Sequence, residues 1–323
     1  MLCASAVLAE NCHLEQIAAV DLVVTKSGSV QIPVEINGIR VQMGIEAGSG
    51  LSAIWSGATA ALNLQPQERI RPGVLHAGGI PLTQTVHINS FKLGNLHWQP
   101  FDALVYPRNH QFSQSLGEDE VVGYLGQDMF SGVDLELDFG AHQLRLYSQK
   151  HCPGKVTYWS SDYDVLALQR NALGNLYMSM AVNGRLVATS LSTLNSISIL
   201  EEGAAKNMGL DGASAGIDAG VGGDGCSFCG SINLKAQGLE IQNARVKIVN
   251  TVAKDCRLSV PRGADGIASY NCLGAFPLRL GVNVLSKLHL YFANGEKKLY
   301  FTVADVNAGN TTTGSAGIAP TAP

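Results

Sequence analysis

The feature that most constrains this chain is an internal repeat, in which one domain-sized pattern occurs twice. The first copy contains Ile36-Asn37-Gly38-Ile39-Arg40-Val41, and the second contains Val182-Asn183-Gly184-Arg185-Leu186-Val187, about 146 residues later. In the same alignment Glu46-Ala47-Gly48 falls on Ser192-Thr193-Leu194. A period this long lies far above the roughly 20 to 50 residues of solenoid repeats. We therefore predict two copies of one folding unit.

Both copies have the pattern of β-structure. Asn37-Gly38 and Asn183-Gly184 each separate two apolar runs, which is the strongest short signal for a β-hairpin because both turn positions need a positive φ. Alternation of apolar and polar residues predicts further strands, and an Ala-containing segment predicts one short helix in each copy. The predicted strands are 30–34, 41–45, 134–139 and 288–292, and the predicted helices are 56–64 and 201–208.

The composition describes a globular protein with ample core. Of the 323 residues 46% are hydrophobic and 15% are charged, which excludes a disordered chain. The net charge of −4 favours neither nucleic acid nor an anionic membrane surface. No apolar run reaches the length of a membrane span. We expect a monomer with no nucleic-acid partner and no membrane span.

The two ends of the chain differ from the repeats. Residues 1–9 are apolar and end Val7-Leu8-Ala9, which fits the end of a signal peptide, although the segment lacks a basic region and is short. We interpret residues 1–19 as a possible signal remnant and N-terminal arm; the alternative is a plain disordered terminus. Residues 304–323 are rich in Gly, Thr, Ala and Pro, which predicts a disordered tail.

Cysteine usage favours an exported protein. Seven cysteines are present, and six remain once Cys3 in the possible signal is set aside. An even number with loop-closing positions suggests disulfides and hence a periplasmic or secreted location, whereas buried free thiols in a cytosolic protein are the alternative. The predicted pairs are Cys12–Cys152, Cys226–Cys229 and Cys256–Cys272.

The segment Cys226-Ser227-Phe228-Cys229 is the sharpest local motif outside the repeat. A metal half-site or a redox pair are the functional alternatives to a structural disulfide. A zinc site needs about four ligands, and neither a second Cys-x-x-Cys nor a paired His is visible. The eight histidines, which we expect on the surface or on strands, show no helix-face metal spacing. We therefore expect no metal and no cofactor.

The order of landmarks in each copy resembles the retropepsin-like aspartic proteases. These landmarks are the Asn-Gly hairpin, the triplet after it, the short helix, a Leu-Gly turn and a closing hairpin, and they cover residues 20–150 and 165–302. Two units on one chain resemble pepsin. The resemblance implies an all-β fold of two retropepsin-like β-barrel lobes related by a pseudo-twofold axis. The implied lobes are 20–153 and 160–303, with a cleft between them.

The catalytic part of the resemblance is degenerate. In that family each lobe supplies one Asp from Asp-Thr-Gly, and the two carboxylates share a proton and activate a water. The dyad positions here hold Glu46 and Ser192. Two adjacent carboxylates cannot both ionise, so one serves as acid and the other as base. Ser192 leaves one titratable group, and the extra methylene of Glu46 displaces its carboxylate by about 1 Å, which alone can lower the rate about 100-fold.

The neighbouring loop positions also depart from the family pattern. Ala47 lacks the hydroxyl that in the family links the two loops, and Leu194 stands where a glycine lets the backbone turn tightly. The implied cleft-loop residues are Ala47, Gly48, Ser49, Thr193, Leu194 and Asn195. The implied flap residues, with flexible surface loops as the alternative, are Gly78, Gly79, Gly222 and Gly223.

Other carboxylates could in principle replace the missing aspartates. Asp128 is the candidate by spacing, although the resemblance implies a structural role for it. Asp134 and Asp138 lie on an alternating strand and are predicted to be solvated. Asp218 and Asp224 lie in a Gly-rich loop and are predicted to belong to a flap.

Two functions remain in competition on the sequence. The first is a pseudoprotease that keeps the cleft and binds an extended peptide or protein segment by strand addition without cutting it. The second is a working endopeptidase that uses Glu46 alone or a compensating carboxylate. A purely structural scaffold is a third possibility, since a fold does not dictate a function.

Overall fold

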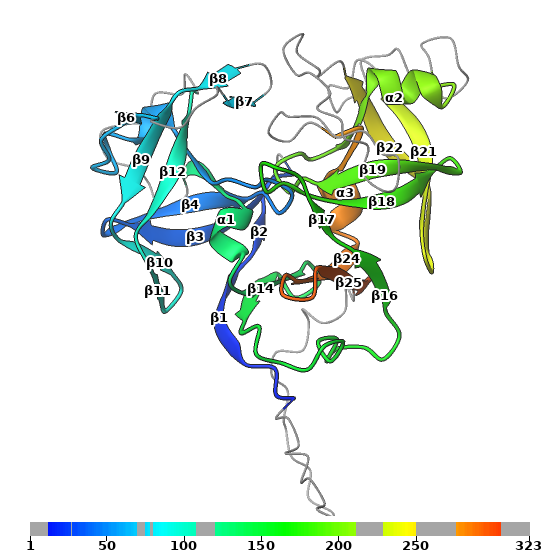
Figure 1. Cartoon of the computed structure of the whole chain (residues 1–323), viewed down its shortest axis with the longest axis horizontal. Helices are drawn as coiled ribbons and strands as arrows, with labels where there is room; N and C mark the ends of the chain where they lie inside the picture. Colours follow the sequence, from blue (N-terminus) through cyan, green and yellow to red (C-terminus); the bar gives the residue numbers. More distant parts are fainter. Residues whose placement is uncertain are drawn as a thin grey trace, which may run out of the picture.

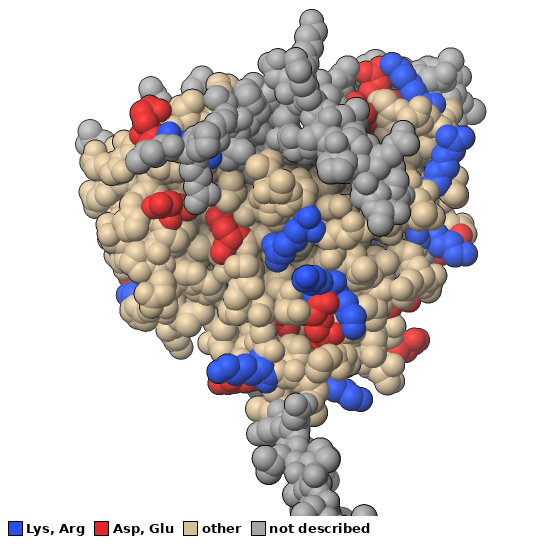
Figure 2. All heavy atoms as spheres, viewed as in Figure 1, with Lys and Arg blue, Asp and Glu red and all other residues tan. Residues whose placement is uncertain are grey.

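The structure is a computed structural model that describes residues 12–26, 28–69, 75–77, 80–107, 120–210, 229–249 and 276–304. Figure 1 shows two β-rich lobes side by side, with a further sheet below them. No helix within the described ranges is both long and apolar enough to cross a membrane. Figure 2 shows that acidic and basic side chains are scattered over one face of the molecule, without a large patch of one sign.

The first lobe is built on a ten-stranded sheet. Its central strand β3 alternates buried and more exposed residues, because successive side chains of a strand point to opposite faces. The strands in spatial order are β11 (Leu96–Trp98), β10 (Phe91–Leu93), β3 (Val30–Ile36), β4 (Ile39–Ile45), β13 (Val121–Leu125), β5 (Ala53–Trp55), β12 (Phe101–Tyr106), β9 (Gln84–Ile88) and β6 (Gln67–Glu68), with β2 (Val23–Val24) paired to β3.

The second lobe is built on a seven-stranded sheet in which β18 also pairs with β21, so the sheet curls back on itself. Strand β18 shows the same alternation of buried residues as β3. The strands in spatial order are β17 (Gln169–Arg170), β18 (Leu176–Val182), β19 (Arg185–Leu191), β23 (Leu278–Leu280), β20 (Ser198–Glu201), β22 (Leu239–Val249) and β21 (Cys229–Ala236).

A six-stranded sheet below the lobes takes three strands from each half of the chain. Its centre is the antiparallel pair of β14 and β24, which joins the two halves directly. The segment from 148 to 163, between the halves, contains no helix or strand. The strands in spatial order are β1 (Gln16–Asp21), β15 (Gln143–Tyr147), β14 (Asp134–Asp138), β24 (Leu288–Ala293), β25 (Lys298–Val303) and β16 (Asp164–Ala167).

The fold is therefore all-β with two barrel-like lobes, as the sequence predicted. The four predicted strands are present as β3, β4, β14 and β24. Both predicted hairpin turns are confirmed, because Asn37 and Gly38 have φ of 50° and 83°, and Asn183 and Gly184 have φ of 47° and 79°. Each Asn-Gly pair thus supplies the left-handed backbone that the turn requires.

One of the two predicted helices is wrong. Residues 56–64 form only the 3-10 helix η1 (Ser56–Ala58) followed by turns, and Asn63 adopts a φ of 55° that ends any helical path. The other prediction is confirmed by α2 (Glu202–Asn207), whose N-cap Glu201 accepts hydrogen bonds from the backbone of Gly203 and Ala204. The other helices are α1 (Gln127–Phe130) and α3 (Val282–Leu285).

The prediction that Asp134 and Asp138 are solvated is also wrong. Asp134 is fully buried and its Oδ2 lies 2.7 Å from His151 Nε2, while Asp138 is only partly exposed. The cause is the segment between the halves, which covers the polar face of the lower sheet. Trp159 of that segment stacks on His289 of β24 at 3.9 Å between ring centroids. A strand's alternation cannot reveal that a distant loop covers its polar face.

The predicted disulfide Cys12–Cys152 is present, with the two Cα atoms 4.9 Å apart. Cys229 is also disulfide-bonded. Cys226, Cys256 and Cys272 lie outside the described residues, and so the pairs Cys226–Cys229 and Cys256–Cys272 stay predictions.

Several other predictions fall on residues that the structure does not describe. They are the signal remnant in 1–11, the tail in 305–323, Gly78, Gly79, Gly222 and Gly223 as flap glycines, and Asp218 and Asp224. Strands β7 (Leu75–Ala77) and β8 (Ile80–Leu82), on either side of positions 78 and 79, pair in antiparallel register. In Figure 1 this hairpin projects from the upper end of the first lobe.

Candidate functional site

Glu46 and Ser192 meet where the two lobes touch. Each directly follows a strand, β4 or β19, that runs parallel to a neighbouring strand, β13 or β23. The backbone N–H of Glu46 donates to Leu125 O at 2.9 Å, and that of Ser192 donates to Leu280 O at 2.8 Å. The Ser192 hydroxyl donates to Glu46 Oε2 at 3.0 Å. Two residues far apart in the sequence thus form one side-chain pair.

Two further donors surround this pair. Asn195 Nδ2 donates to Ser192 Oγ at 2.6 Å, and the backbone N–H of Leu194 donates to Glu46 Oε2 at 3.2 Å. Because Ser192 accepts from Asn195, its own proton is directed to the carboxylate. The second-lobe loop therefore presents only donors to Glu46.

Thr193 links the second loop to the first lobe. Thr193 Oγ1 donates to the carbonyl oxygen of Ile45, and Thr193 O accepts from the backbone N–H of Val30 at 2.8 Å. Ala47, at the equivalent position of the first loop, has no hydroxyl to return such a bond. Its carbonyl oxygen instead accepts from Gln127 Nε2 at 2.9 Å, within the same lobe.

The loops approach each other closely at Gly48. A Cβ atom at this position would lie 2.2 Å from Leu191 O, so only glycine fits. Leu194 occupies the matching position in the second loop, and its side chain lies over Gly44. A Cβ at Gly44 would be only 2.3 Å from Leu194 Cδ2. The absent side chain of Gly44 thus makes the room that Leu194 uses.

Asp128 supports the first loop and does not face Glu46 as a second carboxylate. Its Oδ2 and Oδ1 accept from the backbone N–H and the hydroxyl of Ser52 at 2.8 and 2.6 Å. Ser52 Oγ in turn accepts from the backbone N–H of Gly126 at 2.9 Å. The side chain of Asp128 is thus committed to holding Ser52 and α1, which agrees with the structural role that the resemblance implied.

Burial sets the protonation of Glu46. Loss of solvation raises its pKa from 4.5 to about 7, against the opposing effects of the Ser192 hydroxyl, the Leu194 N–H and the positive charge of Arg279. Ser192 is almost completely buried, whereas Glu46 is only partly so. At neutral pH this site therefore holds a single carboxylate that is about half ionised.

This arrangement lacks half of the chemistry of an aspartic protease. A two-carboxylate site deprotonates a water with one group while the other protonates the carbonyl oxygen. Here the partner of Glu46 is a hydroxyl, which does not ionise near neutral pH and cannot share the proton. One carboxylate remains to act as acid or as base, but not as both in one step.

A second cluster has metal-ligating residue types, but its carboxylates already form ion pairs with an arginine. The ligand atoms of Glu136, Asp138 and His289 lie within 4.8 Å of one another. Arg145 Nη1, however, lies 2.5 Å from Glu136 Oε1 and 3.2 Å from Asp138 Oδ2, and His289 Nε2 lies 2.9 Å from Glu136 Oε1. The guanidinium supplies the positive charge that a metal ion would bring, so we assign this network to the packing of the lower sheet.

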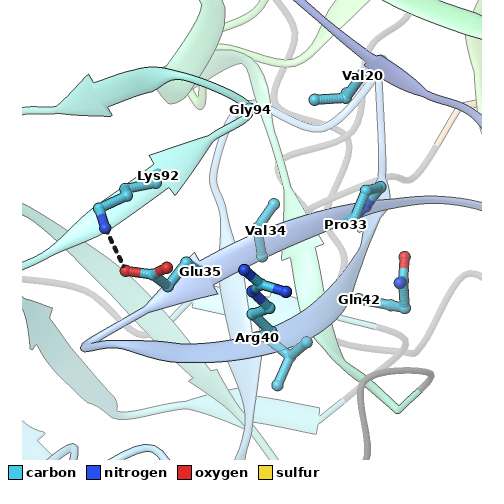
Figure 3. Close-up of a pocket in the computed structure, with 9 residues that line it drawn as sticks. Val20, Pro33, Val34, Glu35, Arg40, Gln42, Lys92 and Gly94 are labelled. Carbon is cyan, nitrogen blue, oxygen red and sulfur yellow. Dashed lines mark ion pairs between the residues drawn. The ribbon is translucent and has the colours of Figure 1, made fainter.

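A pocket of about 330 Å³ lies against β3, β4 and β10 of the first lobe. Figure 3 shows Lys92 and Glu35 forming an ion pair at its edge, with Nζ and Oε1 2.6 Å apart, and Arg40 nearby. Arg40 and Glu46 stand at opposite ends of β4, about 20 Å apart at the ~3.3 Å rise of a strand. This pocket is therefore separate from the Glu46–Ser192 pair.

Sequence reasoning named Glu46, Ser192, Thr193, Leu194 and Asn195, and the structure brings all five together. It did not single out Gly44 or Arg279 as members of the site. The repeat contained a signal for Arg279, because Tyr124-Leu125-Gly126 in the first copy corresponds to Arg279-Leu280-Gly281 in the second. An arginine where the other copy has a tyrosine marks a position at which the two lobes differ.

Comparison with known proteins agrees with this geometry. A family model described as aspartyl protease matches residues 32–129, from β3 to α1. Aspartic proteinase from Irpex lacteus superposes with a TM-score of 0.51 at 9% identity, covering 91% of this chain and 99% of that chain. No curated protein sequence matches this chain at a significant level.

Two seed proteins are also similar in structure. Conglutin gamma, a unique basic 7S globulin from lupine seeds, has a TM-score of 0.49 at 12% identity, covering 93% of this chain and 98% of that chain. Basic 7S globulin from soybean has a TM-score of 0.48 at 10% identity, with the same coverage of 93% and 98%. The Irpex lacteus match shows that this chain has the bilobal fold of the aspartic proteinases, and the family model shows aspartyl protease sequence character in its first lobe.

Proposed function

We propose that this protein is a pseudoprotease, which binds an extended peptide between its lobes and does not hydrolyse it by the two-carboxylate mechanism. One observation carries the proposal: the position opposite Glu46 is held by Ser192, whose hydroxyl donates to the carboxylate at 3.0 Å. A hydroxyl in this place supplies a hydrogen bond but neither the second charge nor the shared proton that activates a water.

Peptide binding is supported by the β-sheet frame of the two lobes and by the β7–β8 hairpin. The lobes keep the all-β frame around the pair, and β7 and β8 form a hairpin at the upper end of the first lobe. A strand with a free edge can add an extended peptide through main-chain hydrogen bonds, without any chemistry at the site. The disulfide Cys12–Cys152 supports a periplasmic or secreted setting for such binding, because disulfides persist in oxidising compartments.

The second candidate is a peptidase that uses Glu46 alone. It is favoured by the pKa of Glu46, which burial raises to about 7 and which makes this carboxylate a stronger base than an exposed one. A lone base predicts a rate that rises with pH through about 7, whereas a proton-sharing pair gives a bell-shaped profile.

The test is a peptide-library cleavage assay from about pH 3 to 8. The parent protein is compared with a variant carrying Glu46→Asp, Ala47→Thr, Ser192→Asp and Leu194→Gly, which rebuilds both triplets. We expect no cleavage by the parent and a bell-shaped, acid-favoured activity from the rebuilt variant. Binding of the same peptides is followed by fluorescence polarisation.

Cleavage by the parent that is lost in Glu46→Gln would replace this proposal with the single-base peptidase. Parent cleavage that persists in Glu46→Gln would place the activity elsewhere. An absence of peptide binding in the parent would overturn the pseudoprotease proposal.

A further inference from the structure

Arg279, on β23, is a partly buried cation for which the described residues offer no ion-pair partner. Its Nε is shielded from solvent and makes no hydrogen bond, and within the described part of the chain no carboxylate forms an ion pair with its guanidinium. Burial lowers the pKa of Arg279, because lost solvation outweighs the attraction of the Glu46 charge. Glu46 attracts this charge from a distance but forms no direct ion pair with it.

Two other arginines, Arg145 of the lower sheet and Arg170 of β17, show what a hydrogen-bonded guanidinium looks like in this fold. Arg145 is similarly buried, yet it donates to both Glu136 and Asp138, and its pKa is raised as a result. Arg170 is exposed and still donates to Gln127 Oε1 and Asn294 Oδ1, each at 3.2 Å. An arginine that is partly buried without such acceptors destabilises the fold, and a bound anion would relieve this cost.

The position of Arg279 relates it to the Glu46–Ser192 pair. It lies directly opposite Ser190 in the parallel register of β19 and β23, so the two side chains share one face of the sheet. Ser192 follows two residues after Ser190 and lies towards the same face. Ser190 is nearly fully buried. Arg279, whose Nε lacks an acceptor among the described residues, and Ser190 therefore lie side by side next to the Glu46–Ser192 pair.

We propose that Arg279 and Ser190 bind a carboxylate of the peptide ligand, either an acidic side chain or a free C-terminus. This inference rests on the proposed peptide-binding function and names the chemistry that its ligand must carry. A guanidinium offers a planar fork of N–H donors that matches the two oxygens of a carboxylate, and a serine hydroxyl supplies one more donor. A bound carboxylate would supply the acceptors that Arg279 lacks.

The first-lobe side of the junction is closed to such a group. There the equivalent of Ser190 is Gly44, whose open space is occupied by the Leu194 side chain. The equivalent of Arg279 is Tyr124, which is buried and hydrogen-bonded to Ser49. Among the described residues of these two equivalent positions, a guanidinium and a hydroxyl therefore lie side by side in the second lobe and not in the first, so the carboxylate would be bound at one defined end of the ligand.

Glu46 makes this binding depend on pH. The titratable groups around it are Arg279, Tyr124 and, beyond Tyr124, Asp128. Below about pH 7 Glu46 is largely protonated, so Arg279 presents an uncompensated positive charge. Above that pH ionised Glu46 repels an incoming carboxylate. Since a peptide carboxyl itself ionises near pH 4, the affinity is expected to be highest between roughly pH 5 and 6.5.

The experiment uses matched pools of N-acetylated, C-amidated hexapeptides, with Glu at one position in one pool and Gln at the same position in the other. At pH 5.5 the parent is expected to bind the best Glu pool at least 10-fold more tightly than its Gln match. Arg279→Met and Ser190→Ala should reduce that preference, the first to about 1-fold, and Arg279→Lys should retain part of it. Arg185→Met, an exposed arginine of the same lobe, is the matched control and should leave the preference unchanged.

Two further measurements keep the outcomes distinct. Sodium N-acetylglutamate should raise the unfolding temperature of the parent more than N-acetylglutamine does, and this difference should be absent from the Arg279→Met variant. Without ligand, the Arg279→Met variant should unfold at the same temperature as the parent or at a higher one. Sodium phosphate identifies the competing source of the anion: an Arg279-dependent stabilisation by phosphate alone, with no Glu preference, would overturn the carboxylate assignment. Equal binding of Glu and Gln pools would overturn this subsite and leave peptide binding in place. Failure of every peptide pool to bind, with an intact response to N-acetylglutamate, would overturn the peptide function and keep the subsite.

Discussion

Glu46 and Ser192 end equivalent strands of the two lobes, yet the triplets that begin with them differ at every position. In the first lobe the triplet supplies a carboxylate, a methyl group and the close approach of Gly48. In the second it supplies a hydroxyl, the Thr193 bond to Ile45 and a leucine side chain. In the hydrogen bonds made by these triplets, Glu46 of the first accepts, and the Ser192 hydroxyl and the Leu194 N–H of the second donate. The asymmetry leaves one carboxylate and one hydroxyl, joined by a hydrogen bond, where the two loops meet.

The supports of the two loops, by contrast, are nearly the same. Ser198 repeats the role of Ser52, since its Oγ accepts from the backbone N–H of Gly281 at 2.9 Å. Asn283 repeats the role of Asp128, because its Oδ1 accepts from both the N–H and the hydroxyl of Ser198 at 2.8 and 2.9 Å. The frame therefore depends on small polar contacts that both lobes keep, while the reactive groups depend on single side chains that they do not.

Gly48→Ala should have the largest effect on this comparison. The new Cβ would meet the backbone of Leu191, at 2.2 Å from its oxygen, and neither loop can withdraw without breaking its strand pairing. We expect a loss of more than about 3 kcal/mol in the free energy of unfolding, as measured by urea denaturation.

The control is Gly132→Ala, where an added Cβ has no neighbour within 4 Å. It should change the free energy of unfolding by less than about 0.5 kcal/mol. Similar stability of the two variants would show that the loops can separate at Gly48.

The sequence identified the frame better than it identified the contacts. Apolar alternation and the two Asn-Gly turns were enough to predict the β3–β4 and β18–β19 hairpins, since these signals are local. The resemblance then placed Glu46 opposite Ser192. The sequence could not predict that Arg279 Nε has no hydrogen-bond partner among the described residues, because this depends on where residues distant in the sequence lie in the fold. It also could not predict that the Leu194 side chain of the other lobe packs over Gly44.

Glu46→Gln should have the next largest effect. Since burial raises the pKa of Glu46 from 4.5 to about 7, the folded state holds this proton more tightly than the unfolded state. The stability of the parent should therefore fall as the pH rises from about 4.5 to 7, by up to roughly 3 kcal/mol from this group. Gln cannot ionise and can still accept from Ser192, so the variant should lose this pH dependence.

The measurement is urea denaturation of both proteins at several values of pH between 4 and 8, with Glu15→Gln as a control for the loss of one exposed carboxyl. A parent and a Glu46→Gln variant with parallel curves would mean that Glu46 has the same proton affinity in the folded and unfolded chains.

Gly44→Ala tests the compensation between Gly44 and Leu194. The added Cβ would lie 2.3 Å from Leu194 Cδ2, the end of a side chain that can rotate, so the expected loss is about 1–2 kcal/mol. Leu194→Ala alone should also destabilise, because it uncovers Gly44. In the double variant the new methyl group fills the vacated space, and we expect a favourable coupling energy of about 1 kcal/mol or more in the double-mutant cycle. Strictly additive losses would contradict direct packing of the two residues.

Asp128→Asn is the mildest change. It places in the first lobe the residue type that Asn283 provides at the equivalent position of the second. Loss of solvation raises the pKa of the Asp128 carboxyl against the opposing hydrogen bonds from Ser52, so the folded state binds the proton more tightly and stability falls as the pH rises above the unfolded pKa. Asp128 stays exposed, and solvent keeps this effect small. An amide can accept from Ser52 through one oxygen, as Asn283 does from Ser198, but its Nδ2 needs the acceptor that Asn283 finds in Arg245 O at 2.8 Å. These opposing changes should leave the variant within about 1 kcal/mol of the parent at pH 5, with a smaller decline towards pH 7.5 than the parent shows. A loss of more than about 2 kcal/mol at both pH values would mean that the first loop requires two acceptor oxygens, and that the two supports are alike in geometry but not in chemistry.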